Sequence, residues 1–596
     1  MPGFALVAGE RSNRADFTDA ALSMMRPGLA LEIVADVPGV AVAGVSSYDG
    51  YPWTLVASGD DCAALDGGVY DLTSPRLQAD LGVLLEQFAA NPAGTRIAVE
   101  RWARARDGDF ILALICPRRE AALVINDTLG RLPVYMGRND RGVVLARELK
   151  FARRWGSFDE PDRHAVAQSL IFGWPLGRRT FARGVSRMRE ATSVAVDLKR
   201  ADFDVRSYHA WNFEELDKAA SQSQVRCGEL AEAFIGRCHA QTRWAANRPI
   251  AVALSGGLDS RAALAGFVRA GAHPSAVTFV RGDSADRESD LARRVAGVLG
   301  APHFVHRLAA STWEDFEELA DIRDGNNYIG VAFMCRFLEA VVAQFGRHVC
   351  YVSGDGGDRI LADLRGHSLH SIDAFVDLRL SKAIWPHEIA SKLVGISTSE
   401  LVDRVKEHFA SYPERSSVYW GPHFELLDRC WNGLFDGEER NRAYVWSLSP
   451  FYCQSFYQLC LKVPWGSKRH HSLYAEFMRA LDPGAARLPN ASWGGALGSP
   501  RARATAVARD AFDRLPIPIQ THIKSRLSAY RPAAIPRSHR VRFQSLIATL
   551  DHGLFDKSAM TALGRSAMTQ AQFDSLTTAI LYETRRSDVA GSSILA

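Results

Sequence analysis

The 596-residue sequence predicts an α/β protein in two parts, a strand-rich N-terminal part and a C-terminal part built on a parallel sheet flanked by helices. Three observations support this prediction. Residues 1–205 contain short apolar runs separated by polar, glycine- and aspartate-rich turns, as expected of β-strands. From residue 226 onward, short apolar runs alternate with stretches of helical periodicity, which is typical of a parallel sheet with helices on both faces. Residues 370–596 have mainly helical spacing.

The composition is that of a globular protein with a sizeable core. With 47% hydrophobic residues, the chain is long enough for two or three domains. Its net charge of +4 is too small to indicate nucleic acid as a partner. Nine cysteines without a CxxC pair are typical of reduced thiols, not of a disulfide framework or a zinc site. Because the sequence shows neither a signal peptide nor an apolar run of membrane-spanning length, we expect a soluble, cytoplasmic protein.

The first part, residues 1–205, is expected to form one domain of strands with a few helices. Helical spacing occurs near 76–90 and again near 161–172. Residues 206–225 are polar and aperiodic, and we expect them to link this domain to a second one that spans 226–596. The clearest strand candidates are the apolar runs Phe4–Ala8, Ala41–Val45, Phe110–Ile115 and Ala121–Ile125.

The second domain is expected to open with a helix near 224–246 and then a short buried strand. Ile250–Leu254 is apolar, too short for a helix, and bounded by Pro249 and Gly256. After Ser260 the apolar residues recur at helical spacing. Because ligands of parallel sheets bind beyond the carboxyl ends of the strands, the loops that follow such strands are the candidate site. Further strands are expected at 275–280, 303–306 and 349–352, and further helices at 288–299 and 331–345.

The loop after the first strand, Ser255-Gly256-Gly257-Leu258-Asp259-Ser260, has the composition of an anion-binding turn. Its glycines let the backbone approach a phosphate, its serines add hydroxyl donors, and a helix N-terminus follows. The aspartate fits such a pocket if a divalent cation lies between it and the phosphates. The lysine of a Walker A loop is missing. The alternative is a plain turn in which Asp259 or Ser260 caps the helix.

A second strand and loop repeat this design. The apolar run Val349–Val352 leads into Ser353-Gly354-Asp355-Gly356-Gly357-Asp358. Alone, this glycine- and aspartate-rich string is weak evidence, and it lacks the order of a calcium-binding loop. On the parallel-sheet prediction, however, both loops would lie at the same edge of the sheet and could face one another.

Taken together, the two loops resemble those of the asparagine synthetase family. The first is similar to the pyrophosphate-binding S-G-G-x-D-S motif of ATP pyrophosphatases, and the second to the family's S-G-E-G-x-D-E motif. The N-terminal part resembles the family's glutaminase domain, which is an Ntn-type sandwich of two sheets between helices. That resemblance rests on Gly108–Phe110, Asn126–Tyr135 and Leu145–Lys150, with a weaker match at Asp66–Asp71.

The N-terminal part departs from a working glutaminase. An enzyme of this type needs a cysteine as its mature first residue, because the thiol is the nucleophile and its own α-amine the base. Here position 2 is Pro2, and the first cysteine is Cys62, deep in the domain. Gly68 stands where the family has a glutamine-contacting glutamate. We therefore expect this domain to release no ammonia from glutamine and to serve as structure or as a wall for another substrate.

The resemblance implies a site for ATP and Mg²⁺ at the two loops. Residues 255–260 would hold the β,γ-pyrophosphate, and Asp259 and Asp358 would each ligate Mg²⁺. A substrate carboxylate would attack the α-phosphorus, and an amine would then convert the acyl-adenylate into an amide. The residues around the adenosine would be Leu254, Val280 and Gly354, and Ser353 is a further candidate for binding the nucleotide.

Two further residues are candidates for the amide-forming step. The family uses a lysine late in the synthetase domain, and Lys468 occupies that region here. His471 is the alternative if the alignment shifts by one turn, and a plain surface lysine is the competing interpretation. Asp355 would act as the base for the amine or orient it, and the sequence leaves both roles open.

Three kinds of amide-forming enzyme in this family compete as models for the chain. Asparagine synthetases receive ammonia from a glutaminase, which is missing here. β-Lactam synthetases lack the cysteine but carry tyrosine at the position of Asp355. Lasso-peptide macrolactam synthetases share a degenerate N-terminal domain and a G-D-G-G-D second loop, so this chain resembles them most.

That resemblance implies a peptide substrate. An Asp or Glu side chain of a leader-free peptide would be adenylated, and the N-terminal amine would close a macrolactam. The implied partners are a precursor peptide, a leader protease and a leader-recognition protein. A nucleotide-binding scaffold without activity is the non-enzymatic alternative, although the intact Asp259 and Asp358 argue against it. The arginine-rich stretch Arg501–Arg542 fits either a solvated helical surface or a partner-docking face.

Overall fold

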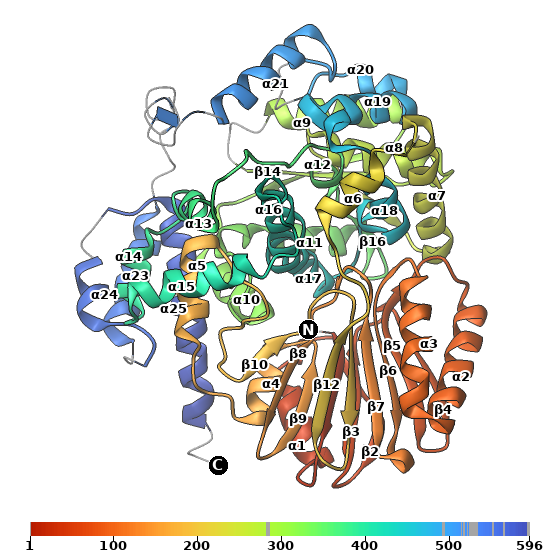
Figure 1. The fold of residues 1–596 in the computed structure, drawn as a ribbon, viewed down its shortest axis with the longest axis vertical. Coiled ribbons are helices and arrows are strands. Elements are labelled where there is room, and N and C mark those ends of the chain that lie inside the picture. Colours follow the sequence, from red (N-terminus) through yellow and green to blue (C-terminus); the bar gives the residue numbers. More distant parts are fainter. Residues whose placement is uncertain are drawn as a thin grey trace.

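The computed structural model describes residues 2–223, 225–281, 286–490, 495–513, 515, 519–520, 523, 535–550, 553–563 and 567–592. Figure 1 shows a strand-rich N-terminal body below a larger body of helices around a parallel sheet. The last helix, α25 (Gln570–Ser592), returns to pack against α5 (Arg163–Phe172) of the first body. The α/β fold class predicted from the sequence is confirmed.

Two six-stranded antiparallel sheets form the N-terminal sandwich. Their strand orders are β10-β8-β9-β1-β3-β2 and β12-β11-β7-β6-β5-β4. In chain order the strands are β1 (Gly3–Ala8), β2 (Ala30–Val37), β3 (Ala41–Ser47), β4 (Trp53–Ser58), β5 (Asp61–Val69), β6 (Gly108–Cys116), β7 (Ala121–Asn126), β8 (Tyr135–Asn139), β9 (Gly142–Ala146), β10 (Val185–Arg187), β11 (Thr192–Asp197) and β12 (Asp202–Ser207).

Helices cover the outer face of each sheet. In β1, Phe4 and Leu6 face the other sheet, while Ala5 and Val7 pack under α1 (Arg14–Leu22) and α4 (Leu149–Gly156). The second sheet is covered in the same way by α2 (Ser74–Ala90) and α3 (Pro92–Arg104). Because both faces of the central strands are buried, strands such as β1, β6 and β7 occur in the sequence as continuous apolar runs.

The second body is built on five parallel strands in the order β15-β14-β13-β16-β17. Helices α7, α8 and α9 pack on one face of this sheet and α10 and α11 on the other. The chain order reverses between β13 and β16, so the loops after these two strands open into one crevice. The strands are β13 (Ile250–Ala253), β14 (Ser275–Arg281), β15 (His303–Leu308), β16 (Cys350–Val352) and β17 (Trp446–Leu448).

Helices make up most of the remaining chain. Those before or within the sheet are α6 (Phe213–Ala220), α7 (Cys227–Ala245), α8 (Leu258–Arg269), α9 (Asp286–Leu299), α10 (Trp313–Arg323), α11 (Phe333–Phe345) and α12 (Gly357–Ile360). Later ones are α13 (Ile372–Leu380), α14 (His387–Leu393), α15 (Thr398–Ala410), α16 (Trp420–His423), the π-helix η5 (Phe424–Leu434), α17 (Phe435–Arg442), α18 (Gln454–Leu461), the 3₁₀ segment η7 (Trp465–His471), α19 (Ser472–Leu481), α20 (Pro483–Arg487), α21 (Pro500–Asp513), α23 (Arg537–Thr549) and α24 (Lys557–Leu563).

The strands and helices named from the sequence are confirmed, with two differences. Several strands were not named from the sequence, and β17 is one of them, because three residues inside a stretch of helical spacing carry no periodicity of their own. Residues 206–225, expected to be aperiodic, contain helix α6, which the Asn212 side chain caps by accepting a hydrogen bond from the Glu215 N–H.

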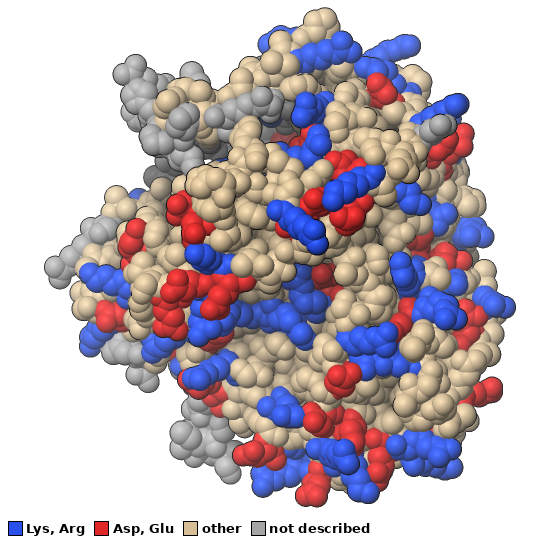
Figure 2. Space-filling model, in the orientation of Figure 1, with Lys and Arg blue, Asp and Glu red and all other residues tan. Residues whose placement is uncertain are grey.

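On the face of the molecule drawn in Figure 2, neither positive nor negative side chains form one large uniform patch. Figure 2 shows Lys and Arg interspersed with Asp and Glu across it, as the small net charge suggests. Of the arginine-rich stretch Arg501–Arg542, α21 and the start of α23 are described, while most of residues 514–534 lies outside the described residues. Among the helices that the structure describes, none is long and apolar enough to cross a membrane.

Candidate active site

The two glycine-rich loops meet directly at the point where the strand order reverses. The backbone N–H of Asp358 donates to the Asp259 carboxylate at 3.1 Å. A Cβ atom added to Gly354 would lie 2.5 Å from the backbone nitrogen of Ser260, so the two main chains touch there. Only glycine allows this approach without displacing the opposite loop.

The first loop forms an open helix start. Gly257 is the N-cap residue of α8, not Asp259 or Ser260, and no side chain in the described structure caps this turn. The Ser255 and Ser260 hydroxyls lie 3.0 Å apart, and the Ser255 hydroxyl accepts a hydrogen bond from the Gly257 N–H at 3.0 Å. The helix dipole and these donors at the crevice make an anion-binding arrangement.

Asp259 connects three elements of the site. Its carboxylate accepts a 2.5 Å hydrogen bond from the Tyr474 hydroxyl of α19, besides the one from the second loop. Burial and the neighbouring Asp358 carboxylate raise the pKa of Asp259 to about 8. A divalent cation bound by both carboxylates would relieve this repulsion. No group of three or more His, Cys, Asp or Glu side chains in the described residues forms a complete metal site.

Lys468 lies beside the helix that leaves the second loop. Its Nζ donates to the Ile360 carbonyl of α12 at 2.9 Å and lies 4.7 Å from the centre of the Trp465 ring. The side chain is fully buried, and this burial lowers the pKa of Lys468 to about 8. His471 lies in the same segment with a left-handed backbone (φ 58°), and burial lowers its pKa as well.

A cavity of about 1720 Å³ opens over these loops. Its lining includes most of the residues predicted for the site: Leu254, Ser255, Gly257, Asp259, Ser260, Ser353, Gly354, Asp355, Asp358 and Lys468. Gly256 and Val280 do not line it; Gly256 is buried behind the loop. Val280 is 2% exposed because successive side chains of a strand point to opposite faces, and Phe279 lines the cavity instead.

Asp355 is exposed to the cavity and enclosed by protein on its other sides. This enclosure raises the pKa of the Asp355 carboxyl, an effect that the nearby Arg440 guanidinium partly offsets. Arg440 and the neighbouring Asn441 come from α17, eighty-five residues further along the chain, and both line the cavity. Sequence reasoning missed these two residues.

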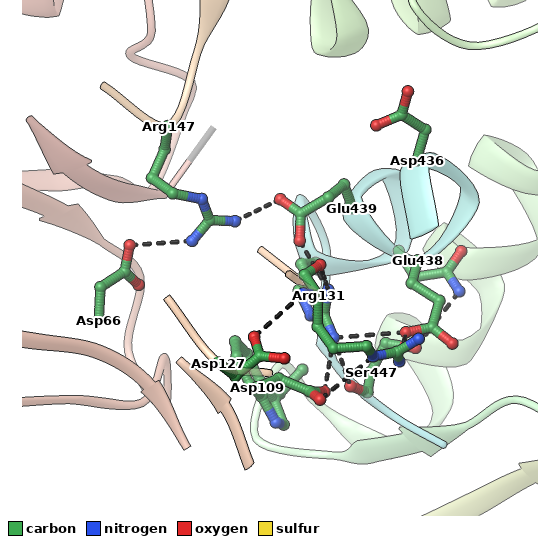
Figure 3. A network of polar contacts seen from close by, with 12 residues as sticks. Asp66, Asp109, Asp127, Arg131, Arg147, Asp436, Glu438, Glu439 and Ser447 are labelled. Atoms are coloured by element: carbon green, nitrogen blue, oxygen red, sulfur yellow. Dashed lines mark hydrogen bonds and ion pairs between the residues drawn. The ribbon is translucent and has the colours of Figure 1, made fainter. Parts of the chain in front are cut away.

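The second loop is also tied to the N-terminal sandwich by buried charges, which Figure 3 shows. The Ser353 hydroxyl donates to Glu438 at 3.1 Å, and Glu438 forms an ion pair with Arg131 of the sandwich. Burial raises the pKa of Glu438 to about 7 although Arg131 and Arg442 lower it. Arg442 in turn donates to Asp109 at 2.7 Å. The Asn126–Tyr135 stretch thus lies at the junction of the two bodies.

A second branch of this network reaches the start of the chain. Arg147 pairs with both Glu439 and Asp66, and the Phe4 N–H donates to the Asp66 carboxylate at 2.9 Å. The Tyr51 hydroxyl donates to the same carboxylate at 2.5 Å. Every one of these side chains is at least nine-tenths buried, so the charges are compensated within the protein.

The region of the expected glutaminase pocket is filled. Pro2 is buried, and burial raises the pKa of the Cys62 thiol to about 12, far from a reactive thiolate. A Cβ atom at Gly68 would lie 2.7 Å from the Trp244 ring, which packs over this position from α7. The sandwich contributes instead to the large cavity, where Phe172 and Trp174 form part of the wall.

Comparison with known proteins finds one family model that matches part of the chain. Residues 239–425, which contain both loops, match the asparagine synthase family. This match supports an asparagine synthetase-like domain and, with it, ATP-dependent amide-forming ligase activity in general. None of the curated proteins matches the chain.

Two solved structures align at low similarity. One is titled as the allosteric regulatory enzyme of purine biosynthesis (12% identity, 52% of this chain, 81% of that one, TM-score 0.26). The other is glutamine phosphoribosylpyrophosphate amidotransferase from B. subtilis with ADP and GMP (10% identity, 64% of this chain, 89% of that one, TM-score 0.24).

Proposed function

We propose that this chain is an ATP-dependent peptide macrolactam synthetase. It adenylates an Asp or Glu side chain of a leader-free peptide and joins it to the peptide's N-terminal amine, releasing AMP and pyrophosphate. The proposal rests above all on the contact between the two glycine-rich loops, where the Asp259 carboxylate accepts a hydrogen bond from the Asp358 N–H at the floor of a large cavity.

In the first step, the first loop and the start of α8 bind the β,γ-phosphates of ATP, with Leu254, Ser353 and Gly354 near the adenosine. Asp259 and Asp358 would hold Mg²⁺, which would neutralise phosphate charge when bound. The peptide carboxylate attacks the α-phosphorus, and the bond to the bridging oxygen of pyrophosphate breaks. The loops supply position and electrostatic stabilisation, since the adenylate is itself a reactive electrophile.

In the second step, the peptide amine attacks the adenylate carbonyl, loses a proton, and AMP leaves. Asp355, a residue of the second loop that lines the cavity, accepts that proton or orients the amine. Lys468 stabilises the negative charge that develops as the carbon–oxygen bond to AMP breaks. The α-amine, with a reference pKa of about 8, is already about one-tenth neutral at pH 7, so a weak base suffices.

The size of the cavity favours a peptide over a small molecule. Sites for small molecules usually measure about 300–1,000 Å³. The cavity here is about 1720 Å³, and its walls come from both bodies of the protein. A peptide that must meet its own side chain needs such an enclosure to hold it folded.

The experiment is pyrophosphate release from Mg·ATP with a synthetic leader-free peptide from a short reading frame beside the gene. We expect release with this peptide, loss of one water from its mass, and no release when its acidic acceptor residue is replaced by the amide. Release with aspartate and ammonia, or with a small β-amino acid, would identify a small-molecule ligase instead. Tight ATP binding without turnover on any carboxylate would identify a scaffold.

A further inference from the structure

A buried arginine of α17 points to a ligand that the two loops do not explain. Arg440 is 7% exposed and lines the cavity. Its guanidinium donates to two neutral amides, the Asn441 side chain at 2.9 Å and the Asn327 side chain at 3.4 Å. Its Nε atom is buried without a hydrogen-bond partner in the described structure, a feature it shares with most of the buried arginines nearby. Burial lowers the pKa of Arg440.

The positive charges of neighbouring buried arginines are balanced by carboxylates, whereas that of Arg440 has no such partner among the described residues. Within the described chain, Arg440 forms no salt bridge, whereas the buried arginines at the junction of the two bodies all pair with carboxylates: Arg131, Arg147, Arg187, Arg323 and Arg442. An uncompensated cation held out of water is costly. A group that lines a cavity can instead be compensated by an anion that enters the cavity.

The position of Arg440 indicates which anion. Asp355 lies near enough for each charge to affect the other's pKa, yet the two form no salt bridge in the described structure. Both line the same cavity. A ligand between them would turn a negative group toward Arg440 and an amine toward Asp355. The phosphates of ATP, by contrast, face the helix start at residues 255–260 on the other loop.

We propose that Arg440 binds the side-chain carboxylate of the acyl substrate. This inference rests on the proposed function and deepens it by naming the residue that positions the reacting group. A guanidinium can grip both oxygens of a carboxylate at once. One oxygen then attacks the α-phosphorus and becomes the ester oxygen of the adenylate. The other stays on Arg440 as the carbonyl oxygen, where the guanidinium stabilises the negative charge that forms when the amine attacks.

The test measures ligand binding by the full-length protein and needs no turnover. The probe is N-acetyl-L-aspartate α-methylamide, whose only charge is the side-chain carboxylate, and its neutral partner is N-acetyl-L-asparagine α-methylamide. NMR titration should show that the wild-type protein prefers the carboxylate by at least about tenfold. Arg440→Gln should abolish this preference and leave the Kd for Mg·ATP within about twofold of the wild-type value.

A matched control is Arg153→Gln. Arg153 is also buried and lies over the Tyr582 ring 5.1 Å from its centre, but it does not line the cavity, so its loss should keep the carboxylate preference. If Arg440→Gln fails to fold, Arg440→Lys keeps the charge without the two-pronged geometry and should weaken probe binding about tenfold.

Several outcomes would overturn the inference. The first is that the wild-type protein does not prefer the carboxylate probe to the amide probe. The second is that this preference survives in both Arg440 variants. The third is that ATP binding and probe binding are lost together, which would place a phosphate at Arg440.

Peptide-dependent pyrophosphate release separates the two proposals. Release that continues at the wild-type rate in Arg440→Gln overturns only the role of Arg440. Loss of the preference in a protein that never releases pyrophosphate supports the carboxylate site and rejects the macrolactam function.

Discussion

Lys468 is fully buried beside helix α12, which follows the second loop, and its ammonium contacts the Ile360 carbonyl and the Trp465 ring. A buried lysine without a carboxylate partner is unfavourable for folding, so its presence is better explained by chemistry than by stability. A substitution of Lys468 can therefore separate an effect on activity from an effect on stability.

We expect Lys468→Met to lower peptide-dependent amide formation at least about 100-fold while the melting temperature stays equal or rises, because an apolar side chain of similar length removes the buried charge. Activity assays and thermal unfolding check this. The control is Lys392→Met on the exposed side of α14, which should change neither amide formation nor the melting temperature. A large fall in the melting temperature of Lys468→Met would mean that the lysine has a structural role.

The pH dependence of stability gives a second test of the same residue. Burial lowers the pKa of Lys468 from 10.5 to about 8, so between these values the unfolded chain binds the extra proton and the native chain does not. Stability should therefore rise with pH from about 8 to about 10, and this rise should be smaller in Lys468→Met. Denaturant unfolding of both proteins across this pH range measures the free energy of unfolding. If it changed with pH equally in both proteins, the burial assigned to Lys468 would be refuted.

At the level of single residues, the sequence predicted those that belong to short motifs and missed those that are brought to the site only by the packing of a distant helix. The two loops were recognisable because glycines, serines and aspartates occur together in each. Glu438 and Arg440 were not, since Glu438–Arg442 resembles a solvated charged helix until its burial is known. Val280 was named from the family resemblance, whereas Phe279 lines the cavity, because sequence alone does not show which face of a strand points to a cavity.

At the level of elements, the site depends on the contact between the turn after β13 and the turn after β16. A Cβ atom at Gly354 would lie 2.5 Å from the Ser260 nitrogen and 2.7 Å from its Cα, both rigid backbone atoms. Gly354→Ala should therefore push the loops apart, lower stability by about 1–3 kcal/mol and weaken Mg·ATP binding at least about tenfold. Calorimetric titration with ATP and thermal unfolding measure both effects.

The control for this prediction is Gly297→Ala in helix α9. An added Cβ there meets no atom within 4 Å, so this change should raise stability by about 0.5–1 kcal/mol and leave ATP binding unaltered. If Gly354→Ala bound ATP as well as the wild-type protein, the loop contact would not be part of the nucleotide site.

The central strands could be predicted because they are buried on both faces and appear as apolar runs. Half-exposed edge strands such as β2, β4 and β12 were not named from the sequence. Nor was β17, which completes the parallel sheet next to β16 with only three residues. The helix α17 just before it supplies Glu438 and Arg440, so the unpredicted stretch is also the one that brings the missed residues to the site.

On the scale of the whole molecule, the N-terminal sandwich is joined to the second glycine-rich loop by the buried charge network. Arg131→Met would leave Asp109 and Glu438 without a main partner in a place that water does not reach. We expect a loss of about 3–5 kcal/mol in the free energy of unfolding. The exposed pair of Arg118 with Asp60 serves for comparison, and Arg118→Met should cost about 1 kcal/mol or less. Equal effects would show that the network is not a structural joint.

The same sandwich should have no glutaminase activity. Pro2→Cys should release no ammonia from glutamine, because the Trp244 ring fills the space beside Gly68 where the substrate would have to bind. Ammonia release by Pro2→Cys, measured with a coupled glutamate dehydrogenase assay, would contradict this account of the N-terminal part.

The most direct test of the central claim follows one oxygen atom. A leader-free peptide with ¹⁸O in its acidic acceptor side chain is incubated with the enzyme and Mg·ATP, and the nucleotide products are analysed by mass spectrometry. If the two loops hold ATP for attack at the α-phosphorus, AMP will carry one ¹⁸O atom and pyrophosphate none. Label in inorganic phosphate together with ADP, or unlabelled AMP, would contradict it.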